Sequence, residues 1–225
     1  MGRAKEIVLK VIPSNIANNF VKKHHYSGKV VPNSQLHFGC FLDSKLGGVM
    51  SYGCPMDKRK MLSLVETQNK TELKKWNEFL ELNRMAFSDT LPKYAESRCI
   101  AISIKLIKKN APHVKWIVSY ADATQCGDGT IYRASGFILT SIKKNNTIIK
   151  LKNGNIVASM NYTKGKNILK QGGRAGIPKG AKKLSGYMLR YIYLIDKKSK
   201  LNVPVIPFSK IKEMGIGMYK GKMRV

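Results

Sequence analysis

Residues 96–142 read ESRCIAISIKLIKKNAPHVKWIVSYADATQCGDGTIYRASGFILTSI, and this stretch decides the fold. Isoleucines at helical spacing and two closing lysines predict a helix over 98–109. An apolar, β-branched run then predicts a strand over 115–121, after which the chain turns polar. A glycine-containing turn leads to a short helix over 130–135 and to a further strand over 137–142. The stretch therefore predicts helix, strand, helix and strand in succession.

The chain before this stretch supplies one more helix and three strands. Residues 14–25 begin with an N-cap type residue and space their apolar side chains on one helical face. Two β-rich runs, 36–42 and 46–53, are joined by a polar turn of hairpin length and predict an antiparallel pair. A strand expected over 80–87 has polar groups on both faces, with Glu81, Asn83 and Met85 on one side and Leu82, Arg84 and Ala86 on the other.

The chain after residue 142 adds a basic hairpin over 147–159, with Asn153-Gly154 as its turn, a Gly/Lys-rich loop over 163–186 and a strand over 187–195. We expect an α/β (α+β) protein whose mixed, mostly antiparallel central sheet is flanked by helices. Residues 1–142 would form the catalytic core, and residues 143–225 a basic part that completes the sheet and contacts nucleic acid.

The charge of the chain is far from balanced. It has 41 Lys and Arg against 13 Asp and Glu, a net charge of +28. Residues 143–225 hold 20 basic and 2 acidic side chains, whereas residues 1–142 hold 21 and 11. Because such an excess repels itself without a polyanion, we expect a nucleic-acid partner whose binding weakens steeply with salt.

Other classes of protein find little support in the sequence. No stretch approaches the roughly 20 apolar residues of a membrane span, and the start, MGRAKE, lacks the apolar core of a signal peptide, so we expect a cytoplasmic protein with no membrane partner. Four cysteines without a C-x-x-C pair favour free thiols over a zinc site or disulfides. Nucleotide-hydrolase and protease motifs are absent from the sequence.

Polar side chains gather in otherwise apolar segments. Taken alone, each has an ordinary explanation, such as a helix cap for Ser97, a turn for Asp122 and an ion pair with Glu81 or Asp89 for Arg84. In an α/β sheet, however, ligands collect beyond the carboxyl ends of strands and at helix N-termini. The sequence therefore predicts one pocket, lined by Glu81, Asn83, Arg84, Ser97, Arg98, Asp122, Thr124, Gln125 and Tyr132.

A second candidate group, at the end of the first helix, is His24, His25 and Tyr26, which could supply a pair of metal ligands or a general base. Adjacent side chains on a helix point about 100° apart, and no carboxylate lies nearby in the sequence. A basic cluster at a helix end is favoured over a metal site here.

Five segments closely resemble the Mom family of bacteriophage DNA-modification proteins, within an order of elements that looks like the GNAT acyltransferase fold. The resemblance covers roughly residues 20–142, and its most specific feature is YADATQ followed by G-x-I-Y. The segments are HHYS (24–27), ELNRMAF (81–87), ESRCIAISIKLIKK (96–109), SYADATQ (119–125) and GTIYRASGF (129–137).

The resemblance implies an enzyme of the host bacterial cytoplasm that replaces a hydrogen of the exocyclic amine of adenine in double-stranded DNA by a carbamoylmethyl group. This modification protects phage DNA from host restriction nucleases. The target base would be flipped out of the duplex, where Tyr52, Tyr94 or Tyr120 would stack on it.

The same resemblance assigns residues to roles. The catalytic residues that it implies are Asp122 as base, Tyr132 as acid, Arg84 and Ser97. Cofactor-binding positions are Ser97, Arg98 and Tyr52, and a metal site with iron would use His25 and Tyr26. We expect contacts with nucleic acid from Lys93, Tyr94, Arg174, Lys182 and Lys183.

For the donor of the transferred group, the resemblance leaves two expectations, acetyl-CoA and glycyl-tRNA. GNAT enzymes bind the CoA pyrophosphate with a glycine-rich loop before a helix, but residues 92–97 contain no glycine and include Glu96, whose carboxylate would oppose phosphate. This disfavours CoA. An N6-glycyl group contains the same atoms as N6-carbamoylmethyl, so a glycyl donor would serve, and tRNA would be a second nucleic-acid partner.

Two other functions fit the sequence. One is a non-catalytic nucleic-acid-binding protein, for which a basic C-terminal part with interleaved tyrosines suffices; it predicts that Asp122→Ala leaves the function intact. The other is an acetyltransferase that acts on RNA. A basic protein is disfavoured as a substrate because a chain of charge +28 would repel it.

Overall fold

The structure is a computed structural model that describes residues 2–69, 71, 75–159, 177–219 and 222–223. The chain divides into two compact units built from alternating segments. The first unit comprises residues 1–120, 129–141 and 190–207, and the second comprises residues 121–128, 142–189 and 208–225. The division expected from the sequence instead falls once, at residue 142, and the roles expected for those two parts stay predictions.

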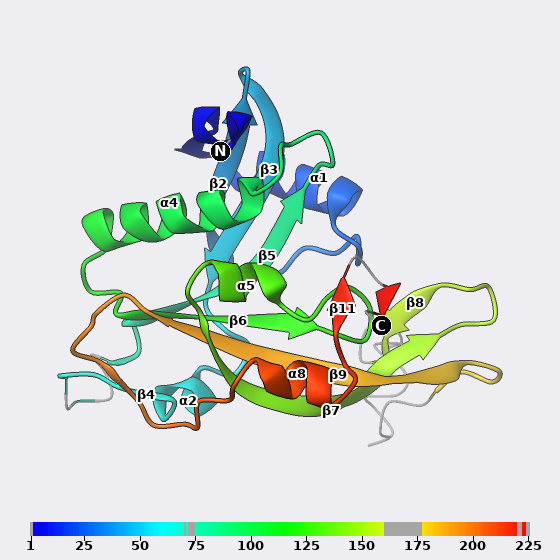
Figure 1. Ribbon diagram of the computed structural model, residues 1–225. Coiled ribbons are helices and arrows are strands. Elements are labelled where there is room, and N and C mark those ends of the chain that lie inside the picture. Colours follow the sequence, from blue (N-terminus) through cyan, green and yellow to red (C-terminus); the bar gives the residue numbers. More distant parts are fainter. Residues whose placement is uncertain (1, 70, 72–74, 160–176, 220–221, 224–225) are drawn as a thin grey trace, which may run out of the picture. The chain divides into compact units, whose positions relative to one another are not determined.

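A mixed sheet of eight strands runs in the order β1-β2-β3-β5-β6-β9-β7-β8 (Figure 1). β5 and β6 pair in parallel, whereas β1–β2, β2–β3, β3–β5 and β7–β8 pair antiparallel. The predicted mixed, mostly antiparallel sheet is confirmed. Its strands are β1 (Val8–Val11), β2 (Ser34–Leu42), β3 (Lys45–Gly53), β5 (Phe79–Phe87), β6 (Trp116–Asp122), β7 (Ile138–Lys150), β8 (Ile156–Ala158) and β9 (Lys182–Leu194).

The remaining elements are helices and short strand pairs. β10 (Lys200–Leu201) pairs with β4 (Val65–Glu66), and β11 (Met218–Tyr219) pairs with β12 (Lys222–Met223). The helices bounded within the described residues are η1 (Arg3–Glu6), α1 (Ser14–His24), α2 (Lys58–Leu62), α4 (Ala95–Asn110), α5 (Thr130–Ala134) and α8 (Ser209–Glu213). None of the helices in the described ranges is long and apolar enough to span a membrane.

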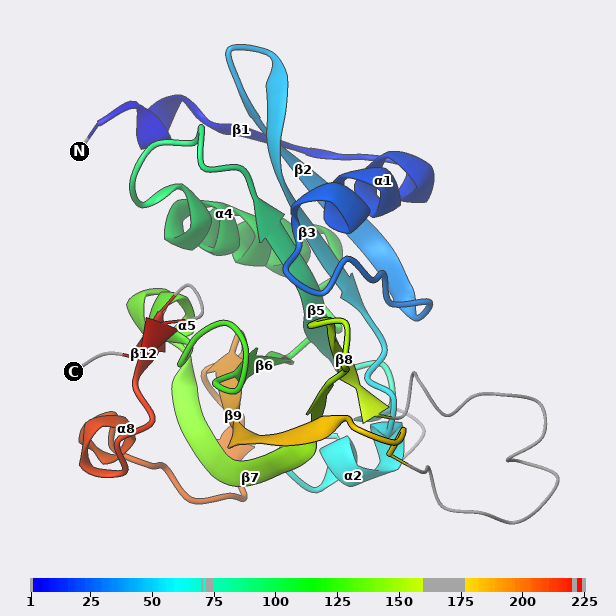
Figure 2. The same cartoon turned by 90° about the vertical axis from the view of Figure 1, so that its right-hand side faces the viewer.

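Within the first unit, α1 and α4 lie on opposite faces of the strands β2, β3 and β5 (Figure 2). On the α1 face, Ala17 and Val21 of the helix pack with Val49 and Ala86 of the sheet. On the α4 face, Tyr52 of β3 contacts Ser103 of the helix through a hydrogen bond. Because successive strand residues point to opposite faces, Val49, Ser51 and Gly53 lie on the α1 face and Tyr52 on the α4 face.

A β-bulge at Asn83 changes the expected faces of β5. Arg84 pairs with Ser51 and Leu82 pairs with Tyr52, so Asn83 is an extra residue without a partner on β3. Directly paired residues share a face, which places Arg84 and also Glu81, the partner of Gly53, on the α1 face. The prediction that Glu81 and Arg84 lie on opposite faces is therefore wrong, because it assumed an unbroken alternation.

The predicted loop over 163–186 also needs correction, because β9 already begins at Lys182. The glycine that suggested a loop, Gly186, lies within this strand. A Cβ there would lie 2.6 Å from Cβ of Thr124, so the position demands glycine for close packing and not for a turn. The part of the predicted loop over 163–176 lies outside the described residues.

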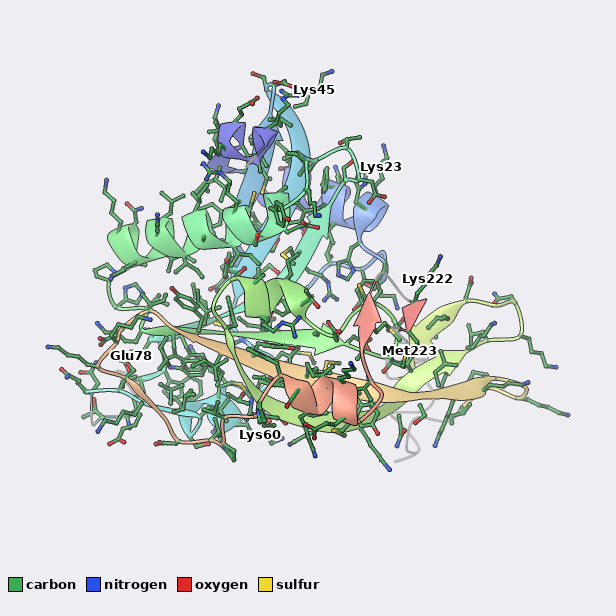
Figure 3. The ribbon with its side chains drawn as sticks, in the orientation of Figure 1. Lys23, Lys45, Lys60, Glu78, Lys222 and Met223 are labelled. Carbon is green, nitrogen blue, oxygen red and sulfur yellow. The ribbon has the colours of Figure 1, made fainter. Side chains whose placement is uncertain are left out.

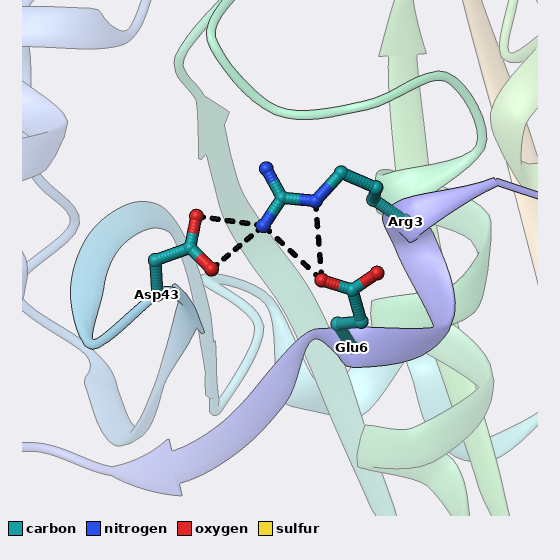
Figure 4. Close-up of polar contacts among 3 residues, drawn as sticks. All are labelled: Arg3, Glu6 and Asp43. Atoms are coloured by element: carbon teal, nitrogen blue, oxygen red, sulfur yellow. Dashed lines mark hydrogen bonds and ion pairs between the residues drawn. The ribbon is translucent and has the colours of Figure 1, made fainter.

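The surface carries charged side chains in ordinary solvated arrangements. Lys23, Lys45 and Lys60 project outward from their elements (Figure 3). Arg3 forms ion pairs with Glu6 and with Asp43 in the turn between β2 and β3 (Figure 4). All three of these side chains are more than half exposed, so these pairs contribute little to stability.

Candidate active site

The candidate active site lies on the α1 face of β5, where Glu81 and Arg84 share a side of the sheet. The segment that follows α1 supplies the polar neighbours of Arg84 on this face. On the same face, Phe79 stacks on Trp116 at 4.5 Å between ring centroids, next to Val118 in the same apolar cluster. Glu81 therefore lies between an apolar cluster and a guanidinium.

Arg84 is held by main-chain carbonyls. Its Nε donates to the carbonyl of Lys29 at 2.8 Å, and its Nη1 donates to the carbonyl of Asn83 at 3.0 Å. Burial lowers the pKa of Arg84, while Tyr26, Glu81 and Tyr132 raise it, and an arginine keeps its charge in such surroundings. Arg84 is therefore a fixed cation, and it is not ion-paired to Glu81 or Asp89 as the simpler explanation required.

Glu81 is the carboxylic acid of this face. Burial raises its pKa to about 7, and the charge of Arg84 opposes that rise. The raised pKa of Tyr120 on the neighbouring strand also responds to Glu81. With the residues that the structure describes, the Glu81 side chain makes no hydrogen bond or ion pair. Glu81 can therefore exchange a proton near neutral pH.

His25 does not fit the role of a metal ligand. Its Nδ1 accepts the main-chain N–H of Ser27 at 3.2 Å and lies 2.8 Å from the Ser27 hydroxyl, so in the neutral ring the proton is on Nε2. Neither nitrogen then offers a free lone pair to a metal. Over the described ranges, no group of three or more His, Cys, Asp or Glu side chains could hold an ion. The proposed iron site at His25 and Tyr26 is not supported.

Tyr132 belongs to a cluster of aromatic rings in the first unit. Its ring centroid lies 5.4 Å from that of Tyr191 and 5.5 Å from that of Phe137, and the residue is 8% exposed. The charge of Arg84 is near enough for Tyr132 to affect its pKa. The structure thus brings together Arg84, Tyr132 and the segment at His25 and Tyr26.

The predicted residues before and in the first turn of α4 make other contacts. Ser97 donates to the carbonyl of Tyr94 at 3.3 Å, and Arg98 donates to the carbonyl of Lys5 at 3.0 Å. Tyr94 is 62% exposed and has a left-handed backbone with φ of 71°, and Lys93 lies over its ring at 5.2 Å. Lys93 and Tyr94 are exposed to solvent, whereas the hydroxyl of Ser97 is bonded within the helix start and not to Arg84 or Tyr132.

Asp122 lies in the second unit, where it organises a turn. Its carboxylate accepts from the main-chain N–H of Thr124 at 2.9 Å, from Gln125 at 2.7 Å and from Asn145 at 3.4 Å. These three hydrogen bonds tie the carboxylate to the turn. In the same unit Lys182 and Lys183 are exposed at the start of β9, and Arg174 lies outside the described residues.

Tyr52 is a core residue, and the prediction that it stacks on a base or binds a cofactor does not suit this conformation. It has no exposed surface, and burial raises the pKa of its hydroxyl. Ser103 donates to the carbonyl of Ile100 at 2.8 Å, so Tyr52 must donate to Ser103, at 2.6 Å. Its role is to join β3 to α4.

Tyr52→Phe is therefore expected to lower the free energy of unfolding by about 1 kcal/mol, because one buried hydrogen bond is lost. Ser103→Ala should cost a similar amount, and the double variant less than the sum, since both remove the same bond. Chemical denaturation measures all three. Full additivity would show that the bond contributes nothing.

His25 and Glu81 give the first unit opposite dependences on pH. Burial lowers the pKa of His25 to about 4, so an unfolded chain binds more protons below pH 6.5 and stability rises with pH from about 4 to 6.5. The raised pKa of Glu81 acts in reverse, so stability falls as pH rises from about 4.5 to 7. The two slopes oppose each other between pH 4.5 and 6.5.

We expect Glu81→Gln to remove the opposing contribution of Glu81, so that the pH dependence of stability due to His25 can be measured. Relative to the unmodified protein, the unfolding free energy of this variant should rise with pH by at most about 1.4 kcal/mol per pH unit over pH 4.5–6.5. His25→Gln should show the opposite slope. Urea unfolding at several pH values measures both, and parallel curves for all three proteins would contradict the assigned burial.

The fold and this ionisable face define a mixed α/β protein with a candidate acid–base site on its sheet. The chain belongs to the Mom protein family, whose family model matches residues 6–210. It is 35% identical over 136 residues to the methylcarbamoylase mom of Escherichia phage Mu, across 60% of this chain and 53% of that protein. The chain thus spans about half the length of the curated relative that it matches.

Solved structures similar to the chain include acetyltransferases. A Bacillus subtilis acetyltransferase in complex with CoA is 11% identical, with a TM-score of 0.46, over 84% of this chain and 97% of that one. A GNAT family acetyltransferase from Elizabethkingia anophelis with acetyl-CoA bound is 13% identical, with a TM-score of 0.46, over 84% and 98%. The Escherichia coli ribosomal-protein-S18-alanine N-acetyltransferase is 10% identical, with a TM-score of 0.47, over 84% and 94%.

Proposed function

We propose that this protein is a transferase that modifies DNA by converting adenine to N6-carbamoylmethyladenine, and that the modification protects phage DNA from host restriction nucleases. Membership of the Mom family carries the proposal, together with the identity to a phage protein named methylcarbamoylase. The net charge of +28 supports a polyanionic substrate, which we propose is double-stranded DNA.

The geometry suggests how the first unit would serve this reaction. Arg84 is a fixed cation that would stabilise negative charge on a carbonyl oxygen as the amine of adenine attacks. Tyr132, held by neighbouring rings, would donate a proton to the leaving group. Exposed Tyr94 beside Lys93 would contact the DNA from which the base is flipped.

For the donor we propose a glycyl ester, such as glycyl-tRNA. Residues 92–97 before α4 have no glycine, and Glu96 occupies the first turn of the helix, so this terminus does not fit a CoA pyrophosphate. Transfer would form N6-glycyladenine. Attack of the glycyl amine on C6 and expulsion of the original N6 as the amide nitrogen would then give N6-carbamoylmethyladenine with no atom gained or lost.

The test is mass spectrometry of nucleosides from the DNA of cells that express the protein, with Asp122→Ala as a comparison. A new deoxyadenosine derivative, in which a carbamoylmethyl group has replaced one hydrogen, is expected, and an unchanged nucleoside profile would overturn the proposed function. In cells fed ¹⁵N-glycine, the exocyclic nitrogen bonded to C6 of the modified base should carry the label. If this nitrogen is unlabelled, the glycyl donor is wrong, but the modification of adenine is not contradicted.

Binding to DNA is expected to weaken steeply with salt. Each phosphate contact adds about 0.9 to the slope of log affinity against log salt, so six contacts would weaken binding by about 10³ between 50 and 200 mM. Fluorescence anisotropy with a labelled duplex measures this slope. Lys93→Ala should weaken binding and reduce the slope by about one, and an unchanged slope would remove Lys93 from the interface.

A further inference from the structure

Two carboxylates are candidates for the base that takes the proton of the adenine amine, and their surroundings differ. Asp122 accepts hydrogen bonds from a main-chain N–H and from two side-chain amides, so its oxygens are engaged in holding a turn. Glu81 accepts no hydrogen bond from the residues that the structure describes. A base needs an oxygen that is open to its substrate, which favours Glu81.

The bulge at Asn83 gives Glu81 its place. Without the bulge, residues 81 and 84 would point to opposite faces of β5. The shifted register instead aligns Glu81 with Gly53 and Arg84 with Ser51, on the same face. Gly53 has no side chain, and main-chain atoms of Asn33 and Ser34 occupy the place where its Cβ would lie. Glu81 and the fixed cation Arg84 are therefore neighbours on this face, opposite Gly53 and Ser51 of β3.

The neighbouring strand completes the surroundings. Glu81 pairs with Val118 of β6 in the parallel register, and Tyr120 follows two residues later on the same face. Apolar Phe79, Trp116 and Val118 exclude water on one side of Glu81. Glu81 itself is still reachable, since its own burial is intermediate. Glu81 is therefore a partly buried carboxylic acid whose oxygens accept no hydrogen bond from the described residues.

We propose that Glu81 is the general base of the transfer reaction, a role that rests on the proposed function. As N6 of adenine forms its bond to the carbonyl carbon of the glycyl ester, Glu81 takes the proton from N6. The carbon–oxygen bond of the ester breaks, and its electron pair leaves on the ester oxygen, which receives a proton and departs as an alcohol. Arg84 binds the carbonyl oxygen, so the acid and the cation act on the two ends of the forming bond.

The pKa of Glu81, raised to about 7 by burial, matches this role, because a base whose pKa lies near the working pH combines availability with strength. The charged group that acts on the titration of Glu81 is Arg84 on the same strand. Tyr120 on β6 also faces this site; its pKa is raised by burial and by Glu81 and lowered by Arg190 of β9. Activity should therefore rise with pH and level off above about 7.

The experiment measures modified adenine in plasmid DNA incubated with clarified extracts of expressing cells, which hold the donor, between pH 5.5 and 8.5. Glu81→Gln keeps the size of the side chain and should reduce the initial rate at least about 100-fold at pH 7.5, with the inflection near pH 7 lost. Glu81→Asp should retain part of the rate with its inflection shifted. Glu66→Gln, the same change at an exposed carboxylate of β4, is the matched control and should leave the rate unchanged.

Folding of each variant is checked by thermal unfolding and by DNA binding, both of which Glu81→Gln should retain. A wild-type protein that modifies no adenine overturns the proposed function, and this inference with it. A wild-type protein that is active and a Glu81→Gln variant that is folded and equally active overturn only the assignment of Glu81. A lowered rate with an unchanged pH profile also overturns it, because a structural role would lower the rate without moving the inflection.

Discussion

Arg84→Met should reduce the fraction of modified adenine in DNA at least about 100-fold, which is the usual effect of removing one group that stabilises an oxyanion. Methionine keeps the length of the stem and removes the cation that the carbonyls of Lys29 and Asn83 hold in place. Arg84→Lys should rescue little, since an ammonium cannot make both bonds in the same fixed geometry.

The loss of DNA modification in Arg84→Met has a second cause, and its dependence on pH distinguishes it from misfolding. The charge of Arg84 lowers the pKa of Glu81, so Arg84→Met should raise that pKa further and keep Glu81 protonated at pH 7. Part of the activity should return at pH 8.5. Arg3→Met, at an exposed ion pair, is the control and should behave as the unmodified protein. If the fraction of modified adenine in Arg84→Met equals that of the unmodified protein, Arg84 has no role in the reaction.

Gly129→Ala should lower the free energy of unfolding by about 3 kcal/mol. Gly129 directly precedes α5 and has a φ of 80°, a region where a Cβ costs about 1–2 kcal/mol. The added Cβ would also lie 2.7 Å from Cζ of Tyr191, a fully buried ring in contact with Tyr132, and overpacking of this kind costs a further 1–3 kcal/mol. Because Tyr191 supports Tyr132, DNA modification should fall as well.

Two alanine variants separate these costs in urea unfolding. Gly154→Ala shares the positive φ, at 84°, but its Cβ would meet no atom within 4 Å, so only the backbone cost of about 1 kcal/mol should appear. Gly127→Ala has no positive φ, and its Cβ would lie 3.5 Å from the carbonyl of Met218, an ordinary contact. If Gly129→Ala costs no more than Gly154→Ala, the ring of Tyr191 moves aside freely.

The secondary structure follows closely from local patterns. The helix expected over 14–25 is α1, and the helix expected over 98–109 is α4, which begins three residues earlier. The hairpin between β2 and β3 is confirmed, with Asp43 and Ser44 at positive φ in its turn. Apolar spacing and turn residues act over a few neighbours along the chain, so such patterns predict these elements.

The site was harder to predict because its members depend on partners distant in the sequence. Arg84 and Tyr132 were predicted, and the structure places them near each other. In the sequence Glu81 is one of many polar residues, and an unbroken alternation of β5 would place it on the face opposite Arg84. The sequence contains one signal for Glu81, which is its place two residues after Phe79 in a predicted strand. Burial at such a place removes water from the carboxylate and raises its pKa.

By itself, the sequence determined the charge of +28, the order of most helices and strands, and the family motifs, because each of these resides in composition or in short-range spacing. Only the tertiary structure decided which side chains share a face. The register between β3 and β5 creates the bulge at Asn83 and brings Glu81 to the side of Arg84. The same pairing places Tyr52 in the core, since a strand residue takes its surroundings from the elements packed on its face.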